Sequence, residues 1–258
     1  MVLNHIDAYL ERINYHGSRA PTAETLRELQ VAHLLTVPFE NLSIHAKQPI
    51  VLDDEALFTK IVVNRRGGFC YEANGLFAAL LRALGFRVTM LAAEVANAEG
   101  EFGPRFDHMT LMVSLEQRWL VDVGFGDSFL EPLLLDESAE QAQGSRAYRI
   151  DSNGTQFVLL QRAEDDEWQA QYRFTLQPYG LADYAEMCRY HQTSPQSHFT
   201  QSRICSRATA EGRITLSEMR FITTSRSGAQ KSRVERTLTS AEEYATILRE
   251  QFGINIDC

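Results

Sequence analysis

The 258-residue chain lacks long apolar runs, since no stretch approaches the ~20 consecutive apolar residues that cross a bilayer. Its start lacks a basic segment followed by an apolar core, so we expect no secretory signal. Cysteine is scarce, and the spacing of Cys70, Cys188, Cys205 and Cys258 is irregular and unlike that of a zinc site. These shortages predict a cytoplasmic protein with no membrane partner and no bound metal.

Positive charge is also in short supply, because 25 Lys and Arg residues face 34 Asp and Glu residues and give a net charge of -9. An acidic chain is a poor partner for nucleic acid or for an anionic membrane. Residues 203–236 are the exception, with eight basic and three acidic residues, a local charge of +5. Two interpretations stay open for this segment: solvated strand edges, or a landing site for a small polyanion.

The hydrophobic pattern changes once along the chain, near Gly85. Before it, apolar residues recur at steps of three and four, which predicts helices. From residue 86 to about 177 they alternate, which predicts an antiparallel sheet or barrel. A helix is then expected over 181–190, a hairpin over 203–223, and a last helix from Ser240. This order indicates an α+β fold.

Cys70 follows two glycines and stands where a helical pattern begins, since Leu76, Phe77 and Leu80 share one stripe. We therefore place Cys70 in the first turn of a helix. There the free N–H groups and the helix dipole favour an anion, which lowers the pKa of a thiol. The alternative is a small, buried, unreactive cysteine.

A nucleophilic cysteine needs a base, and the base needs a group that orients it. His108 opens a predicted strand, and Asp122 lies in the next one, just before Gly124-Phe125-Gly126. A two-residue turn at Glu116-Gln117 would place His108 on the face of Phe125 and not on that of Asp122. A Cys–His–Asp triad therefore requires an odd loop or a β-bulge. Without one, Asp122 caps a turn and His108 merely ends a strand.

These motifs together resemble the arylamine N-acetyltransferase family. Arg66-Gly67-Gly68-Phe69-Cys70-Tyr71-Glu72 resembles its cysteine motif, and Asp122-Val123-Gly124-Phe125-Gly126 resembles its aspartate segment. Val37-Pro38-Phe39-Glu40-Asn41-Leu42 and the stretch from Thr193 to Thr200 also match in order and spacing. The resemblance covers nearly the whole chain, is closest to bacterial members, and is weakest over 208–239.

The resemblance implies a papain-like cysteine-enzyme core made of successive parts. These are an N-terminal helical bundle with the nucleophile (1–85), a central antiparallel β-barrel with the histidine and aspartate (86–180), an interdomain segment (181–200) and a C-terminal α/β lid (201–258).

The resemblance also implies a ping-pong reaction carried by Cys70, His108 and Asp122. The Cys70 thiolate, ion-paired with His108, would take the acetyl group of acetyl-coenzyme A and pass it to an arylamine or arylhydrazine. Transfer to the oxygen of N-hydroxyarylamines follows the same route. Coenzyme A and the small acceptor are the implied partners, and the protein would be a monomer or a weak homo-oligomer.

Further residues have supporting roles by resemblance. The walls of an apolar slot for a flat acceptor would be Phe39, Tyr71, Val95, Phe125 and Phe199. For each of them, plain core packing is the alternative. The loop from Gly126 to Ser128 would contact coenzyme A, and the basic segment 203–236 would suit its phosphates. We also expect a buried ion pair between Arg65 and Glu40 that braces the Cys70 loop.

Other functions fit the same residues. An acyltransferase with another donor or acceptor, such as an amide synthase that closes a polyketide chain, would need a wider cleft. A cysteine hydrolase would use the same triad with water as the acceptor. A silent binding module is a third interpretation, and an intact triad argues against it.

Overall fold

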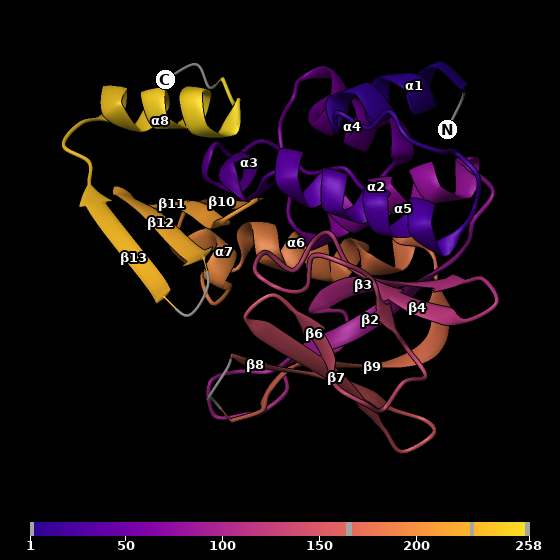
Figure 1. Cartoon of the computed structure of the whole chain (residues 1–258). Helices are drawn as coiled ribbons and strands as arrows, with labels where there is room; N and C mark the ends of the chain where they lie inside the picture. The colour runs from indigo at the N-terminus through magenta and orange to yellow at the C-terminus, as the bar shows by residue number, and fades with distance from the viewer. Residues whose placement is uncertain (1–2, 164–166, 228–229, 256–258) are drawn as a thin grey trace.

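Figure 1 shows the computed structural model, which describes residues 3–163, 167–227 and 230–255, so that Cys258 lies outside the described residues. The helices are α1 (Leu3–Arg12), α2 (Ala23–Thr36), α3 (Leu42–His45), α4 (Asp54–Phe58), the π-helical turn η1 (Thr59–Val63), α5 (Cys70–Ala83), the 3-10 turn η2 (Leu181–Tyr184), α6 (Ala185–Thr193), α7 (His198–Gln201) and α8 (Ala241–Phe252). The strands are β1 (Phe39–Glu40), β2 (Arg87–Val95), β3 (His108–Ser114), β4 (Arg118–Val121), β5 (Leu133–Leu134), β6 (Gln141–Gln143), β7 (Arg146–Ser152), β8 (Phe157–Ala163), β9 (Gln169–Tyr179), β10 (Ile204–Thr209), β11 (Gly212–Ser217), β12 (Arg220–Ser227) and β13 (Gln230–Thr237).

Helix α5 joins the helical part of the molecule to the first sheet. Twelve of its fourteen residues are buried, as expected for a helix that is apolar on most of its surface. It packs against β2 and β3, and its Leu76 and Phe77 share one core cluster with Met109 and Leu111. The start of α5 is therefore fixed with respect to the strands that carry the other polar motifs.

The first sheet is an antiparallel, nearly closed barrel with the strand order β5-β4-β3-β2-β9-β8-β7-β6. Its two edge strands, β5 and β6, are joined by side-chain amides. Gln141 exchanges hydrogen bonds with the backbone of Leu134, at 2.8 and 2.9 Å. Gln143 does the same with Glu131, at 3.1 and 2.7 Å. These amides use the polar groups that an open edge would leave exposed.

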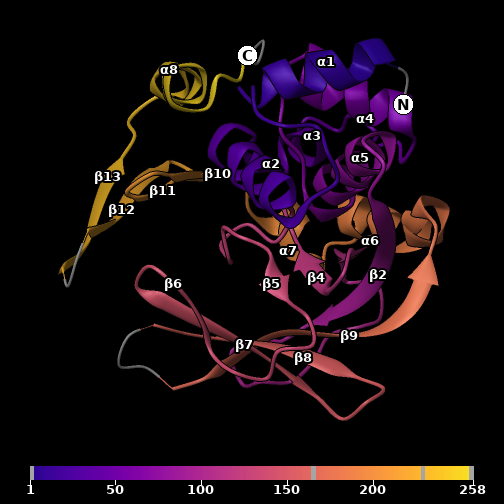
Figure 2. The same cartoon turned by 45° about the vertical axis from the view of Figure 1, so that its right-hand side comes forward.

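The second sheet has the order β1-β10-β11-β12-β13 and combines both ends of the chain. Phe39 of β1 pairs with Ser206 of β10 in antiparallel register. Figures 1 and 2 show this sheet beside the helical part, with α8 above the sheet. The barrel lies below the helical part in both views. Leu248 and Phe252 of α8 pack with Leu42 and Leu216 in a separate core cluster.

The predicted α+β fold with its antiparallel barrel is confirmed. The pattern missed β5 and β6, which are two and three residues long and too short to show an alternation. The helix predicted over 181–190 begins as the 3-10 turn η2 and continues to Thr193 as α6.

Candidate active site

Two glycines allow the chain to approach itself closely just before Cys70. A Cβ at Gly67 would lie only 1.9 Å from the carbonyl oxygen of Pro38. The Gly68 N–H donates to that same oxygen at 3.3 Å. Neither glycine has a positive φ, whereas Arg65 does, at 51°. The glycines therefore serve a close backbone approach, which fixes the junction that leads into α5.

Cys70 is the first residue of α5, as predicted. The preceding Phe69 is extended, with φ -92° and ψ -171°, and its N–H donates to the Glu72 carboxylate at 3.2 Å. This contact is the second half of a capping box, in which the third helical residue reaches back to the N-cap. It fixes the direction in which the Cys70 side chain leaves the helix.

The electrostatics of Cys70 differ from the prediction, because the side chain is buried and 3% exposed. Burial raises the pKa of the Cys70 thiol well above its ordinary value. A backbone hydrogen bond with Met109 opposes this shift, and the negative charges of Asp107 and Asp122 add to it. The prediction of a lowered pKa was wrong, because loss of solvation is the largest of the effects on this thiol. An anionic sulfur here needs a positive neighbour.

The loop between β3 and β4 brings His108 and Asp122 together. Ser114 pairs with Arg118, so the loop has three residues, 115–117, and not the two of a tight turn. This is the odd loop that the triad required, and it places both side chains on one face. His108 Nε2 lies 2.7 Å from Asp122 Oδ2, and both residues are 2% exposed.

Asp122 is held by four donors. They are His108 Nε2 at 2.7 Å, Asn74 Nδ2 at 2.9 Å, the Gly124 N–H at 2.9 Å and Tyr172 Oη at 3.0 Å. Burial alone would raise the pKa of Asp122, but the charge and hydrogen bond of His108, with those of Asn74 and Gly124, hold it below its ordinary value. The ionised carboxylate engages Nε2, which leaves Nδ1 of His108 as the nitrogen that can act as a base.

Gly124 brings the Asp122 segment against the start of α5. A Cβ at this position would lie 2.7 Å from Cys70 Cα and 2.8 Å from Asn74 Nδ2. Such distances force a shift of the helix start or of the amide that holds Asp122.

We expect Gly124→Ala to lower the free energy of unfolding by about 1–3 kcal/mol, because a methyl group must be forced into a filled contact. Gly180→Ala is a matched control, since its Cβ would meet nothing closer than Asp183 Oδ2 at 3.7 Å. Urea unfolding of both variants is the measurement. Equal stability of the two variants would contradict the close contact.

Cys70 and His108 line one cavity of about 410 Å³. This size is within the range of small-molecule sites. Four of the predicted walls also line it, namely Phe39, Val95, Phe125 and Phe199. Phe39 and Phe199 face each other with ring centroids 6.1 Å apart. The cavity thus places aromatic rings around a thiol and an imidazole.

Two other predicted residues lie behind this cavity and do not line it. Tyr71 is fully buried, and its hydroxyl donates to the carbonyl oxygen of Phe106 at 2.7 Å, so it supports the wall from the core. Gly126 adopts a φ of 92°, and a Cβ there would lie 3.8 Å from the ring of Phe39. Gly126 therefore turns the loop behind Phe125 without reaching the cavity.

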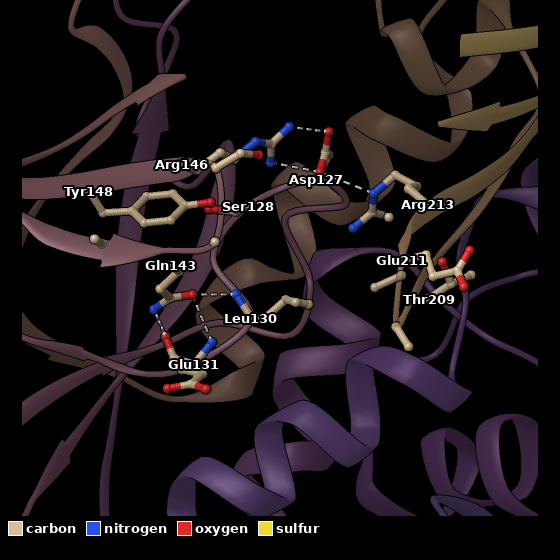
Figure 3. Close-up of a pocket in the computed structure, with 16 residues that line it drawn as sticks. Asp127, Ser128, Leu130, Glu131, Gln143, Arg146, Tyr148, Thr209, Glu211 and Arg213 are labelled. Carbon is tan, nitrogen blue, oxygen red and sulfur yellow. Dashed lines mark hydrogen bonds and ion pairs between the residues drawn. The ribbon is translucent and has the colours of Figure 1, made fainter. Parts of the chain in front are cut away.

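Ser128 faces a second cavity of about 340 Å³ between the barrel and the second sheet. Figure 3 shows Asp127 in this cavity between two guanidinium groups. Arg146 binds Asp127 with two contacts of 2.8 Å, and Arg213 Nε approaches it to 3.1 Å. Ser128 Oγ is buried and has no hydrogen-bond partner among the residues that the structure describes. The loop 125–128 thus separates the Cys70 cavity from this one.

The basic segment 203–236 is largely neutralised where its side chains are described. The ion pairs of its described side chains are Arg203–Glu218, Arg213–Asp127, Arg220–Glu235, Arg233–Glu235 and Arg236–Glu243. Arg207 donates instead to the carbonyl oxygens of Leu35 and Gln251. These contacts favour solvated, ion-paired strand edges over an open landing site for a polyanion.

A buried ion pair braces the Cys70 loop, but Arg65 is not part of it. Glu40 is fully buried, and its Oε1 lies 2.8 Å from Arg66 and 3.9 Å from Lys60. Lys60 also contacts Glu72 at 2.7 Å. Arg65 contributes only its carbonyl oxygen, which accepts a hydrogen bond from another arginine. The adjacent side chains of Arg65 and Arg66 point in different directions, so an error of one residue in the prediction names the wrong partner for Glu40.

Several polar residues near the thiol were missed in the sequence. Asn74 and Tyr172 hold Asp122, while Asp107, His191 and His198 line the cavity. Asp107 stands next to His108, and that adjacency was a usable signal. The others come from α5, β9, α6 and α7. His198 lies in the stretch from Thr193 to Thr200 that resembles the family, but the local pattern of Asn74, Tyr172 and His191 does not distinguish them from ordinary helix or strand residues.

Within residues 3–163, 167–227 and 230–255, no group of three or more His, Cys, Asp or Glu side chains could hold a metal ion. In the same ranges, no helix has both the length and the apolar character needed to cross a membrane.

Known relatives match the whole chain. The arylamine N-acetyltransferase of Escherichia coli (strain K12) is 35% identical over 259 residues, which cover 99% of this chain and 90% of the relative. The proansamycin X synthase of Amycolatopsis mediterranei is 32% identical, over 94% of this chain and 95% of the relative.

Solved structures match as completely. The arylamine N-acetyltransferase of Salmonella typhimurium superposes with a TM-score of 0.92 at 30% identity, covering 100% of this chain and 94% of that one. The enzyme of Mycobacterium marinum in complex with CoA gives 0.87 at 34% identity, covering 97% and 93%. A family model described as N-acetyltransferase matches residues 22–258. The chain therefore belongs to the arylamine N-acetyltransferase family.

Proposed function

We propose that the protein transfers the acetyl group of acetyl-coenzyme A to the nitrogen of an arylamine or arylhydrazine, with Cys70 as the covalent carrier. One observation carries this proposal: a buried His108–Asp122 pair, 2.7 Å apart, shares a cavity with a cysteine at the start of a helix. The chain's family membership supports acetyl-coenzyme A as the donor, because the Mycobacterium marinum relative is described in complex with CoA.

In the first step, Cys70 Sγ attacks the thioester carbonyl while His108 takes the thiol proton. The bond between the acetyl carbon and the sulfur of coenzyme A then breaks, and His108 returns the proton to that sulfur. Because burial raises the pKa of the Cys70 thiol, the sulfur becomes nucleophilic only as the imidazole accepts its proton. Asp122 stabilises the imidazolium that forms and keeps Nε2 protonated.

In the second step, the lone pair of the acceptor nitrogen attacks the carbonyl of the acetyl-cysteine. His108 takes a proton from the nitrogen, the carbon–sulfur bond breaks, and Cys70 regains its proton. An arylamine is unprotonated at neutral pH and can attack directly. Phe39, Phe125 and Phe199 line the cavity and suit the two faces of a flat ring.

The loop Gly126–Ser128 is the proposed contact for coenzyme A. Its neighbour Phe125 lines the Cys70 cavity, and Ser128 lines the cavity between the barrel and the second sheet. A long donor that enters with its thioester at Cys70 has to pass this loop. The buried, unpartnered Ser128 Oγ is a free hydrogen-bonding group on that route.

The similarity to proansamycin X synthase raises amide synthesis on a large acyl chain as a second candidate. The cavity of about 410 Å³ fits a small aromatic acceptor better than a long acyl chain. A hydrolase would use the same residues with water. The partition of acetyl-enzyme between arylamine and water distinguishes these cases.

The experiment is mass spectrometry of the protein mixed with acetyl-coenzyme A and no acceptor. We expect a mass increase of about 42 Da on the Cys70 peptide, which an arylamine then removes with formation of its amide. Cys188 and Cys205 are buried free thiols and serve as internal controls that stay unmodified. Cys70→Ser should give no discharge-competent adduct. Label on another residue, or loss of label to water at the same rate with and without amine, would contradict the proposal.

A further inference from the structure

A second histidine–carboxylate contact lies in the Cys70 cavity and is not used by the proposed reaction. Asp107, just before β3, and His191, from α6, both line this cavity. His191 Nε2 lies 3.3 Å from Asp107 Oδ1, with 7% of the His191 side chain and 22% of the Asp107 side chain exposed. Two polar groups with no role in the proposed reaction thus contact each other beside the aromatic walls of the cavity.

The hydrogen bonds of His191 show which nitrogen faces the cavity. Its Nδ1 lies 3.0 Å from Ser197 Oγ, and that oxygen already accepts the Phe199 N–H at 3.3 Å. We assign the Ser197 hydroxyl as the donor to Nδ1, which places the ring proton of the neutral imidazole on Nε2. Nε2 is buried and makes no hydrogen bond among the described residues, in spite of the nearby carboxylate.

The imidazole of His191 is not free to turn toward a better alignment. It stacks on Tyr71, with ring centroids 6.0 Å apart and an interplanar angle of 27°. The edges of Phe199 and Phe69 close around it, at 5.1 and 6.4 Å. These rings fix the imidazole where Nε2 lies beside Asp107 without a hydrogen bond to it.

The Asp107 carboxylate has unused capacity for hydrogen bonds. An ionised carboxylate offers about four acceptor positions. Within the part of the chain that the structure describes, its polar side-chain contact is the misaligned one with His191. Asp107 and Cys70 line the same cavity, and the charge of Asp107 raises the pKa of the Cys70 thiol.

We propose that Asp107 and His191 form a polar subsite of the acceptor cavity, which binds a second hydrogen-bond donor on the arylamine or arylhydrazine and disfavours an anionic ring substituent. This inference rests on the proposed acetyl transfer and specifies its acceptor class. An N–H or O–H group on the acceptor donates to Asp107, and a lone pair of the same group accepts from His191 Nε2. A carboxylate on the ring would instead meet the charge of Asp107 in a cavity with apolar walls, where charges repel strongly.

The test compares three acceptors of similar size that differ in one ring substituent. They are 1,4-diaminobenzene, which carries a second donor, 4-methoxyaniline, which carries none, and 4-aminobenzoate, which is anionic. Asp107→Asn removes the charge and keeps the shape. Asp151→Asn is the matched control, because Asp151 is an exposed carboxylate paired with Arg149 on β7 and does not line the cavity. For each acceptor, kcat/KM of the variant is divided by kcat/KM of the parent. Differences in intrinsic nucleophilicity between the three acceptors then cancel.

For Asp107→Asn, we expect kcat/KM for 1,4-diaminobenzene to fall about 10-fold relative to 4-methoxyaniline, mostly through KM. The kcat/KM for 4-aminobenzoate should rise about 10-fold relative to 4-methoxyaniline, because the substitution removes a repulsive charge. His191→Gln should also lower kcat/KM for 1,4-diaminobenzene relative to 4-methoxyaniline. Asp151→Asn should leave all three ratios unchanged.

Equal changes for all three acceptors would overturn the subsite, because Asp107 would then act only on the thiol. A fall for 4-aminobenzoate in His191→Gln would also overturn it, since it would make His191 an anion-binding group. Both outcomes leave the acetyl transfer itself standing. Failure of that proposal has a different readout, the absence of an acetyl group on Cys70 when no acceptor is present.

Discussion

Asp122→Asn is expected to lower kcat for acetyl transfer by about 10⁴-fold, the scale on which a triad loses activity when its histidine is held in the wrong tautomer. The amide that replaces the carboxylate can present its NH2 group to His108 Nε2, which then has to accept. The ring proton moves to Nδ1, the nitrogen that should receive the proton of Cys70. The first half-reaction is therefore expected to fail, and the second with it.

Formation of acetyl-cysteine in a rapid-quench experiment is the direct measurement, together with steady-state turnover. Asp136→Asn is a suitable control, because Asp136 is an exposed carboxylate in the turn after β5, paired with Arg118. An amide at position 122 cannot accept all the hydrogen bonds that Asn74, Tyr172 and Gly124 donate, so the substitution can also disturb the fold. Far-UV circular dichroism therefore checks that the variant is folded. Activity within 10-fold of the parent in a folded variant would exclude the orienting role of Asp122.

Arg66→Met is expected to lower the free energy of unfolding by about 3–5 kcal/mol, because it leaves a buried carboxylate without its closest positive partner. Burial alone would raise the pKa of Glu40, and the charges of Lys60 and Arg66 hold it below its ordinary value. After the substitution, Lys60 remains only at 3.9 Å. The carboxylate must then take up a proton or admit water, and both disturb the loop before Cys70.

Urea unfolding measures this effect, and two further variants make it specific. Arg118→Met breaks an exposed ion pair and should cost at most about 1 kcal/mol. Arg66→Met combined with Glu40→Leu removes both charges and should recover most of the lost stability. If the single and double variants are equally unstable, lost packing and not the unpaired carboxylate explains the effect.

The sequence predicted those parts of the site that depend on local chain geometry. The helix that starts at Cys70 follows from a short-range pattern. The parity of β3 and β4 was also informative, because it showed that the triad required an odd loop or a β-bulge, and the structure has the odd loop.

What the sequence did not predict depends on contacts between distant segments. Arg66 and not Arg65 faces Glu40, since the side-chain direction there depends on a left-handed residue that no pattern indicates. The direction of the Cys70 pKa shift depends on how deeply the thiol is buried once all the layers have packed. His191 reaches the cavity only because α6 crosses beneath it, 121 residues after the cysteine.

The pairing of β1 with β10 determines how late in synthesis the cavity around Cys70 can be completed. Residues 39 and 40, which lead into the braced loop, find their strand partner only after residue 206 has been made. Asn41 likewise waits for the backbone of Phe199, Ser202 and Ile204. A nascent chain on the ribosome can therefore assemble its N-terminal helices and barrel early, but the wall beside the thiol is completed only when about four-fifths of the polypeptide has emerged.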